Sequence, residues 1–374
     1  MSSGNSSSDL STGNWMKHNM SSIADYVSLC APFQYLNSFT VYGLLFPIVS
    51  MVTVITNCLI ISVFVERRMR SPTTVLLTGL AASDAIAAAI SVPLYIYLYG
   101  LGFEDRNLSY PMCIYHEYSY IISNIFHTAS AWLTTTLGVQ RYVVVAYPFR
   151  GPRLCTMQKS YTLVCIVFLA APLIYIPTFL YRDFQEVKVD VNGTFVSTCY
   201  CPLSGVEVYD KILVFLKSFL VKIIPCTTLI LVTFALIRRL EIETDRMLRL
   251  QAESEGERRD FRHIRRTSIM VALIVITFLL VEIPSTVKVI ITNLDSTAID
   301  KESDYTMSMY MNFSLLVSYH INFWIYVSLS EHFRTCLRSL CSFRKKSPNH
   351  DHQTSLHSHV HTMCLTEHSK ITHN

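Results

Sequence analysis

The sequence predicts an all-α membrane protein: a seven-transmembrane helix bundle with a short amphipathic eighth helix. Hydrophobic residues make up 51% of the 374 residues. Charged residues make up only 16%, against roughly 25% in soluble chains. The apolar residues form seven long blocks, and basic residues gather beyond every second block. These observations argue against a soluble enzyme, a disulfide-knot toxin and a disordered regulator.

Each apolar block is long enough to cross a hydrocarbon core of about 30 Å, which takes about 20 helical residues. Helices are expected because an isolated segment in lipid must satisfy its own backbone hydrogen bonds. The blocks cover about 39–65, 73–100, 113–144, 160–181, 209–237, 267–293 and 307–330. The predicted organisation is an extracellular glycosylated tail, the bundle, an amphipathic membrane-surface helix and a disordered cytoplasmic tail, at 1–38, 39–330, 331–343 and 344–374.

Basic residues mark one side of the membrane. The segments that follow blocks one, three, five and seven are rich in arginine and lysine, with nine arginines between Arg238 and Arg266 alone. The N-terminal tail and the other loops hold few basic residues, namely Lys17, Arg106, Arg182, Lys188 and Lys301. Because positive residues favour the cytoplasmic side, the sequence predicts a multi-pass protein of the plasma membrane with an extracellular N-terminus.

Further features of the predicted outer side agree with this orientation. Glycan acceptor triplets start at Asn5, Asn19, Asn107 and Asn192, although a serine-rich tail also produces such triplets by chance. Four cysteines fall on the same side, an even number that favours disulfides in an oxidising compartment: Cys30, Cys113, Cys199 and Cys201.

Charged residues inside the apolar blocks need a physical reason, because each costs about 2.5–3.5 kcal/mol near the bilayer centre. Asp84 is either a carboxylic acid hydrogen-bonded to neighbouring helices or part of a cation site with Ser130 and Asn322. Glu282 and Lys222 lie at similar depths in two antiparallel blocks. Either they form a buried ion pair, or Lys222 extends toward the lipid surface and Glu282 is protonated.

Other features concern helix interiors and ends. Pro225 and Pro284 interrupt blocks five and six, and a proline removes one backbone hydrogen bond and can kink a helix. The inner ends of these two helices are therefore expected to swing. Arg141 ends block three, where an arginine commonly anchors to lipid phosphates. Cys336 and Cys341 in the amphipathic segment are either palmitoylated or plain thiols.

The order of motifs resembles that of rhodopsin-like (class A) G-protein-coupled receptors over about residues 39–343. The motifs are Asn57, Leu80-Ala-Ala-Ser-Asp84, Cys113, Gln140-Arg141-Tyr142, Pro225, Pro284 and Asn322-Phe-Trp-Ile-Tyr326. Three departures stand out: Gln140 replaces an acid, Glu282 a tryptophan and Phe323 a proline. These departures, together with Trp132-Leu-Thr and Leu280-Val-Glu-Ile-Pro284, resemble the motifs of one group of receptors. That group is the invertebrate neuropeptide receptors of the sex-peptide/myoinhibitory-peptide and myosuppressin/FMRFamide type.

This resemblance implies a receptor for a short secreted neuropeptide, often amidated, that acts on a heterotrimeric G protein. It implies a disulfide from Cys113 to Cys199, with Cys201 as the alternative partner or as the partner of Cys30. It also implies that Arg141 engages the G protein and that Asp84, Ser130 and Asn322 hold an allosteric sodium ion, with no other cofactor. The switch residues are Gln140, Arg141, Tyr142, Pro225, Pro284, Asn322 and Tyr326.

The predicted function is therefore a receptor and not an enzyme. The expected ligand contacts are Glu117, His127, Lys217, Lys222, Glu282 and Lys288, and the two glutamates would be the natural partners of a cationic peptide. Other expected partners are membrane lipid and, through the C-terminal tail, arrestin, but no nucleic acid. The alternative is a polytopic transporter or channel, which the lack of an internal repeat disfavours.

Overall fold

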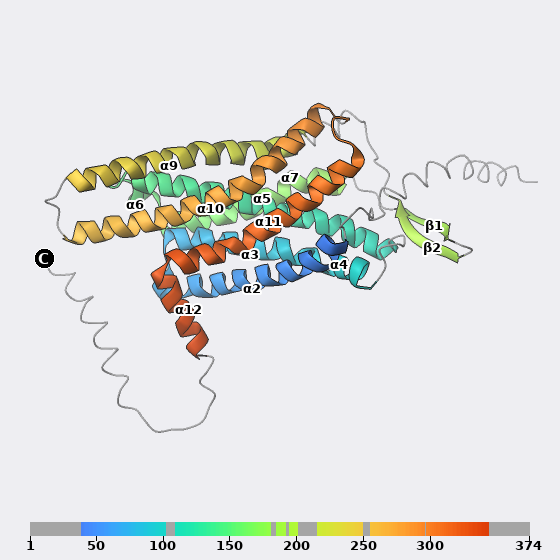
Figure 1. The fold of residues 1–374 in the computed structure, drawn as a ribbon, viewed down its shortest axis with the longest axis horizontal. Helices are drawn as coiled ribbons and strands as arrows, with labels where there is room; N and C mark the ends of the chain where they lie inside the picture. Colours follow the sequence, from blue (N-terminus) through green and yellow to red (C-terminus); the bar gives the residue numbers. More distant parts are fainter. Residues whose placement is uncertain are drawn as a thin grey trace, which may run out of the picture. The chain divides into compact units, whose positions relative to one another are not determined.

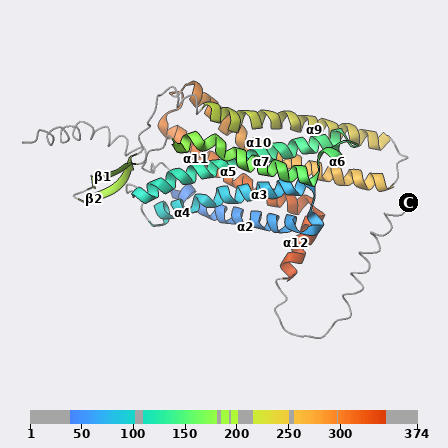
Figure 2. The ribbon, with the colours of Figure 1, turned by 180° about the vertical axis from the view of Figure 1, so that it is seen from behind.

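The structure is a computed structural model that describes residues 39–101, 109–180, 185–191, 194–200, 215–249, 255–295 and 297–343. They fall in two units, Met1–Arg334 and Thr335–Asn374. The first unit holds a bundle of long helices that lie alongside one another (Figures 1 and 2). The last helix, α12, begins in the first unit and continues in the second.

Seven long helical segments form the described part of the bundle. In chain order they are η1 (Phe39–Leu45) with α2 (Phe46–Val65); α3 (Pro72–Ile90) with α4 (Val92–Tyr95) and η3 (Ile96–Gly100); α5 (Tyr110–Ala146); α7 (Met157–Leu180); η4 (Phe219–Ile223) with α9 (Ile224–Arg249); α10 (Glu255–Leu294); and α11 (Lys301–Leu329). Short connecting helices are η2 (Arg67–Met69) and α6 (Gly151–Leu154), and α12 covers Glu331–Phe343.

Local sequence signals explain where two of these helices begin. Ser71 and Thr74 form a reciprocal cap at the start of α3, since each side chain accepts a hydrogen bond from the other's backbone amide. Asp300 caps α11 by accepting from the backbone amide of Ser303 at 2.9 Å. This hydrogen bond lowers the pKa of the Asp300 carboxyl below its usual value.

Five of the described helical segments are, by length and composition, long and apolar enough to cross a membrane. They are Phe39–Val65, Pro72–Gly100, Met157–Leu180, Phe215–Arg246 and Arg262–Leu294. The two other long helices, α5 and α11, carry more polar residues, and several of these are buried, including His127, Ser130 and Asn322. Their polarity therefore belongs to the interior of the bundle.

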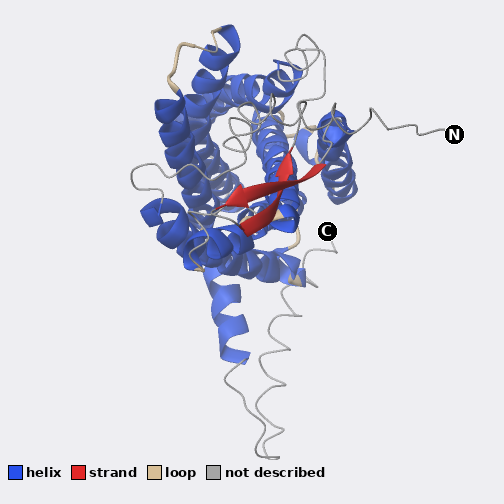
Figure 3. Cartoon of the chain, turned by 90° about the vertical axis from the view of Figure 1, so that its right-hand side faces the viewer, coloured by secondary structure: helices blue, strands red, loops and turns tan. Residues whose placement is uncertain are grey.

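The helix α5 lies at the centre of the bundle. It packs against α3, α7, α9 and α10, while α10 also packs against α9 and α11. The start of α5 contacts β2, one of two antiparallel strands, β1 (Gln185–Val191) and β2 (Thr194–Tyr200), which pair from Gln185 opposite Tyr200. We call the end of the bundle that carries β1 and β2 the hairpin end (Figure 3). We call the opposite end, where α6 and the start of α10 lie (Figure 1), the arginine end.

The hairpin is an addition to the predicted fold, whose helical bundle is confirmed. The sequence holds the signal for it: polar and apolar residues alternate along Gln185–Val191, and an Asn-Gly dipeptide stands between the strands. Alternation of period two indicates a strand, and Asn-Gly is a common hairpin turn.

Candidate functional site

Two cavities that include charged and polar lining residues lie in the described part of the bundle, one in each half. The hairpin-side cavity measures about 120 Å³ and the arginine-side cavity about 900 Å³. The helix α5 contributes to both, through His127 in the first and Arg141 in the second. The helix α10 also contributes to both, through Glu282 and Arg266. The helices α2, α3 and α11 line both cavities as well, so five helices connect them, and α5 and α10 bring titratable side chains to each.

Four side chains from four segments form a continuous polar chain at the hairpin-side cavity. The Nζ atom of Lys222 on η4 lies 2.8 Å from Oε2 of Glu282 on α10. The other carboxylate oxygen lies 3.1 Å from Nε2 of His127 on α5, at ion-pair distance but off the line of a hydrogen bond. Nδ1 of His127 lies 3.0 Å from the hydroxyl of Tyr319 on α11. We call these four residues the charge cluster.

Glu282 is the centre of the charge cluster, and only 2% of its surface is exposed. Lys222 also donates to Oγ of Ser285 at 3.0 Å. An isolated charge in a medium of low dielectric constant is costly, and partners on both carboxylate oxygens offset much of that cost. Of the two arrangements that the sequence left open, the structure contains the buried ion pair.

A second buried acid, Asp84 on α3, is 1% exposed and lies deeper in the bundle. Its Oδ1 accepts from the hydroxyl of Ser130 at 2.7 Å, and its Oδ2 accepts from Nδ2 of Asn322 at 3.3 Å. Both partners are neutral, so the described residues give this carboxylate no opposite charge. A carboxylate, a hydroxyl and an amide supply the oxygen donors that hard cations prefer, so the three residues fit the predicted sodium site.

Only three of the six predicted ligand-contact residues lie at the same cavity. His127, Lys222 and Glu282 line the hairpin-side cavity, whereas Glu117, Lys217 and Lys288 are not among its lining residues. Each of these three has a local partner. Oε1 of Glu117 lies 3.4 Å from Nδ1 of His116. Nζ of Lys217 donates to the hydroxyl of Thr178 at 2.7 Å. Nζ of Lys288 lies 2.8 Å from Oδ1 of Asp304.

Aromatic residues that the sequence analysis did not single out line the same cavity, among them Phe46, Tyr95, Tyr120 and Tyr319. The rings of Tyr42 and Tyr95 stack at a centroid distance of 4.8 Å, and Phe46 lies 4.7 Å from Tyr95. No spacing in the sequence could have identified them, because aromatic residues are frequent throughout the apolar blocks.

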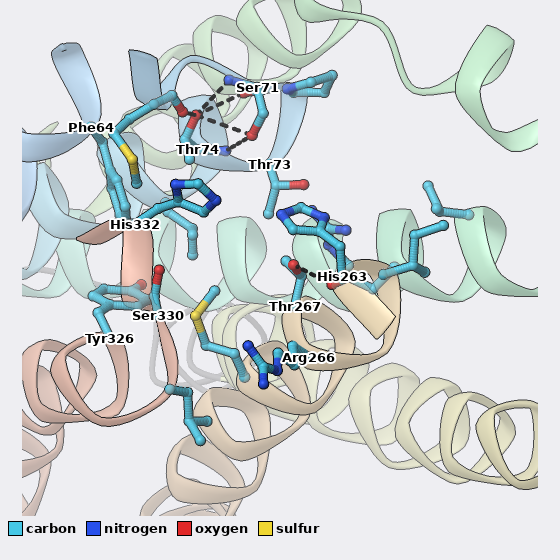
Figure 4. A pocket seen from close by; sticks show the side chains of 18 of the residues that line it. Phe64, Ser71, Thr73, Thr74, His263, Arg266, Thr267, Tyr326, Ser330 and His332 are labelled. Carbon is cyan, nitrogen blue, oxygen red and sulfur yellow. Dashed lines mark hydrogen bonds between the residues drawn. The ribbon is translucent and has the colours of Figure 1, made fainter. Parts of the chain in front are cut away.

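Five arginines are among the residues that line the arginine-side cavity, namely Arg68, Arg70, Arg141, Arg262 and Arg266. Figure 4 shows Arg266 with other lining residues. Arg141 is 8% exposed, and its Nε has no hydrogen-bond partner among the described residues. Its neighbour Gln140 faces elsewhere: the Gln140 amide accepts from Thr73 at 3.4 Å and donates to Ser160 at 3.2 Å. The residue that replaces the usual acid therefore joins α5 to α3 and α7 and leaves Arg141 unpaired.

Four of the other predicted switch residues lie in four separate places. Tyr326 lines the arginine-side cavity and packs against Phe64 and Phe333, with ring centroids 5.2 and 5.6 Å apart. Pro225 is the second residue of α9, two positions after the π-helical turn η4, where the missing proline N–H fits a widened turn. Pro284 lies within α10, and Tyr142 is half-buried and lines neither cavity.

Several predicted modification sites lie outside the described residues. These are the acceptors Asn5, Asn19, Asn107 and Asn192, the cysteines Cys30 and Cys201, and the side chains of Cys199 and Cys341. Cys113 is buried and disulfide-bonded, and β2, which contains Cys199, contacts α5. Cys336 is not part of a disulfide, and its palmitoylation stays a prediction.

Comparisons with known proteins bear on the whole bundle. Residues 56–326 match the model of the 7 transmembrane receptor (rhodopsin family). The chain is 29% identical over 326 residues to the sex peptide receptor of Drosophila melanogaster, over 83% of this chain and 74% of that receptor. It is 26% identical to the sex peptide receptor-related protein 2 of Caenorhabditis elegans, over 80% and 71%. It is 27% identical to the FMRFamide receptor of Drosophila melanogaster, over 85% and 56%.

Proposed function

Because the chain belongs to the rhodopsin family of seven-transmembrane receptors, we propose that it is a plasma-membrane receptor that passes the binding of a short secreted peptide to a heterotrimeric G protein. Family membership makes it a multi-pass membrane receptor and not an enzyme, as the sequence predicted. Its relatives are named for sex peptide and for FMRFamide, which favours a short, amidated neuropeptide as the ligand.

The observation that carries this proposal is the pair of cavities connected by α5 and α10. Titratable side chains of both helices line each cavity: His127 and Glu282 on the hairpin side, Arg141 and Arg266 on the arginine side. A ligand that moves α10 relative to α5 at one cavity changes the shape of the other. Such a bundle suits signal transmission better than transport, the alternative function.

The distribution of charge supports an orientation with the hairpin end outside the cell. Arginines concentrate at the opposite end, and positive residues favour the cytoplasm. In this orientation the N-terminus is extracellular, the peptide enters the hairpin-side cavity, and the G protein meets the arginine-side cavity. We further propose a Cys113–Cys199 disulfide at the outer end, arrestin binding through the C-terminal tail and contact of α12 with membrane lipid.

The charge cluster supports a proposal on which chemical group of the ligand contacts the receptor. Glu282 already has a partner on each carboxylate oxygen, so a cationic ligand group would have to displace Lys222 or His127. Lys222 has three N–H donors and gives two of them to Glu282 and Ser285. The third suits a carbonyl oxygen, such as that of an amidated C-terminus. We therefore propose Lys222 rather than Glu282 as the direct ligand contact.

The peptide activates by binding one arrangement of the bundle better than another, since only a difference in affinity shifts a population. The charge cluster joins η4, α5, α10 and α11, so a ligand group on Lys222 alters the contact that holds α10. The ends of α9 and α10 then separate at the arginine-side cavity, and the G protein binds against Arg141.

A screen of short amidated peptides against cells that express the full chain tests this function. We expect at least one peptide to raise G-protein signalling, and the response to be absent in cells without the chain. Ion current or solute uptake without nucleotide exchange would favour the transporter or channel instead.

The Asp84 site leads to a prediction on sodium. We propose that Asp84, Ser130 and Asn322 hold a sodium ion, which would supply the positive charge that the described residues do not give Asp84. A ligand that binds only the folded state stabilises it. Replacing potassium by sodium at constant ionic strength should therefore raise the melting temperature of the purified receptor, and Asp84→Asn should remove this rise. In the control Ser83→Ala, whose hydroxyl donates to Gly79, the rise should persist, and equal melting temperatures in the two salts would argue against a sodium site.

Gln140 leads to a prediction on activity without ligand. A carboxylate beside Arg141 would attract the guanidinium and favour the arrangement without G protein. Gln140→Glu should therefore lower ligand-independent nucleotide exchange several-fold, about 1 kcal/mol of added pairing. Gln140→Ala, which also loses the contacts to Thr73 and Ser160, should not lower it. An equal fall in both variants would assign the effect to those lost contacts.

A further inference from the structure

The lining of the arginine-side cavity is strongly basic. Its five arginines come from η2 and the residues after it, from α5 and from α10, and the single carboxylate among the lining residues is that of Glu331. Arg262 and Arg266 are one helical turn apart on the same face of α10. Positive groups therefore surround the cavity on several sides, and a single small anion could not contact all of them.

Part of this positive charge, that of Arg141, is buried inside the bundle. More than nine-tenths of its surface is buried, its Nε lacks a hydrogen-bond partner, and no described carboxylate forms an ion pair with it. A buried donor left unsatisfied, and a charge left unpaired, both destabilise the folded state. Since Gln140 is neutral and bonded to Thr73 and Ser160, the neighbouring residue supplies no anion.

The remaining lining suits phosphate oxygens. Ser71, Thr73 and Thr74 lie at the start of α3, where the helix dipole favours negative charge, and the rings of His263 and His332 line the same cavity (Figure 4). Guanidinium groups bind phosphates through paired hydrogen bonds. The volume of about 900 Å³ falls in the range of about 300–1,000 Å³ for small-molecule sites.

We propose that the arginine-side cavity binds a polyphosphate anion of the inositol phosphate class, which supplies the negative charge that Arg141 lacks. The anion is either a soluble inositol polyphosphate or the headgroup of a phosphoinositide lipid, since both carry several phosphates on one ring. It occupies the volume that the G protein needs, so the two exclude each other. This exclusion rests on the proposed function, whereas binding of the anion does not.

Direct binding of inositol hexakisphosphate to the purified full chain, without peptide or G protein, tests the site. We expect saturable binding that weakens about tenfold or more in the Arg262→Gln/Arg266→Gln double variant. Arg265→Gln is the matched control, because Arg265 is exposed and does not line the cavity. A second arm uses vesicles that contain phosphatidylinositol 4,5-bisphosphate, compared with phosphatidylserine vesicles of equal charge.

The outcomes separate the alternatives. Binding in the vesicle arm alone supports the site and assigns the anion to the lipid, and binding in the soluble arm supports a free inositol polyphosphate. If Arg265→Gln weakened binding as much as the Arg262→Gln/Arg266→Gln variant, the proposal would be overturned. The anion would then be attracted by the general positive charge of this end and not by the cavity. Absence of saturable binding in both arms would overturn it as well, as would binding of an acidic peptide in the cavity that inositol hexakisphosphate does not displace. Since no arm measures signalling, failure of the peptide screen leaves this result standing.

Discussion

Reversing the charge of Glu282 alone is expected to remove most of the folded receptor from the cell surface. Glu282→Lys would place a second ammonium group beside Lys222 and leave His127 without its carboxylate partner, in a site where Glu282 is 2% exposed. Breaking a buried ion pair costs about 3–5 kcal/mol, a large part of the roughly 5–15 kcal/mol that stabilises a folded domain. Surface staining of a tagged chain and thermal unfolding in detergent both measure the loss.

The double reversal Glu282→Lys/Lys222→Glu restores opposite charges and should recover a substantial part of the lost stability. The pair Arg246–Glu243 provides the control, because the Arg246 side chain is 67% exposed. Exposed pairs contribute about 0–1 kcal/mol, so Arg246→Glu should have a small effect. If the double variant recovers nothing, or if Arg246→Glu costs as much as Glu282→Lys, the charge cluster does not hold the helices together.

Replacing Arg141 by alanine should abolish most of the signal while leaving the peptide site intact. Arg141 lines the arginine-side cavity, on the opposite side of the bundle from the charge cluster. A hydrogen bond to a charged group contributes about 1.5–3 kcal/mol, and about 1.4 kcal/mol corresponds to a factor of ten. Peptide-stimulated nucleotide exchange should therefore fall about 10- to 100-fold, measured with purified receptor and G protein.

The exposed Arg153 on α6 is the control for this substitution, because it carries the same charge at the same end but does not line the cavity. Arg153→Ala should retain most of the stimulated exchange. A normal rate in Arg141→Ala, at unchanged surface expression, would show that the G protein binds elsewhere.

The seven helices could be predicted from hydropathy. Each long apolar block must lie in lipid, and a segment in lipid must form its own backbone hydrogen bonds, which a helix does. Hydropathy placed the helix ends less well. The fifth block was predicted to end near residue 237, but α9 continues to Arg249, and α10 begins at Glu255, well before the sixth block. These extensions are polar helices outside the apolar core, so hydropathy carries no signal for them. The hairpin was missed for a different reason, since its period-two pattern is short and lies in a loop.

The pair of Lys222 and Glu282 could be predicted from the sequence because two buried opposite charges at similar depth lower each other's cost. The role of His127 in the charge cluster could not be predicted, because it depends on how α5 is rotated toward α10. The direction of Gln140 was equally undetermined, since an amide can bond to Arg141 or to neighbouring helices. Its bonds to Thr73 and Ser160 became evident only in the structure.

The central claim is that the two cavities are coupled, and thermodynamic linkage makes that coupling measurable in either direction. If a peptide at the charge cluster favours the arrangement that binds the G protein, the G protein must raise the affinity for that peptide by the same factor. Peptide affinity should be measured on the purified receptor with and without nucleotide-free G protein. The account predicts an increase of about 5- to 150-fold that GTP reverses. An affinity that the G protein leaves unchanged would contradict it.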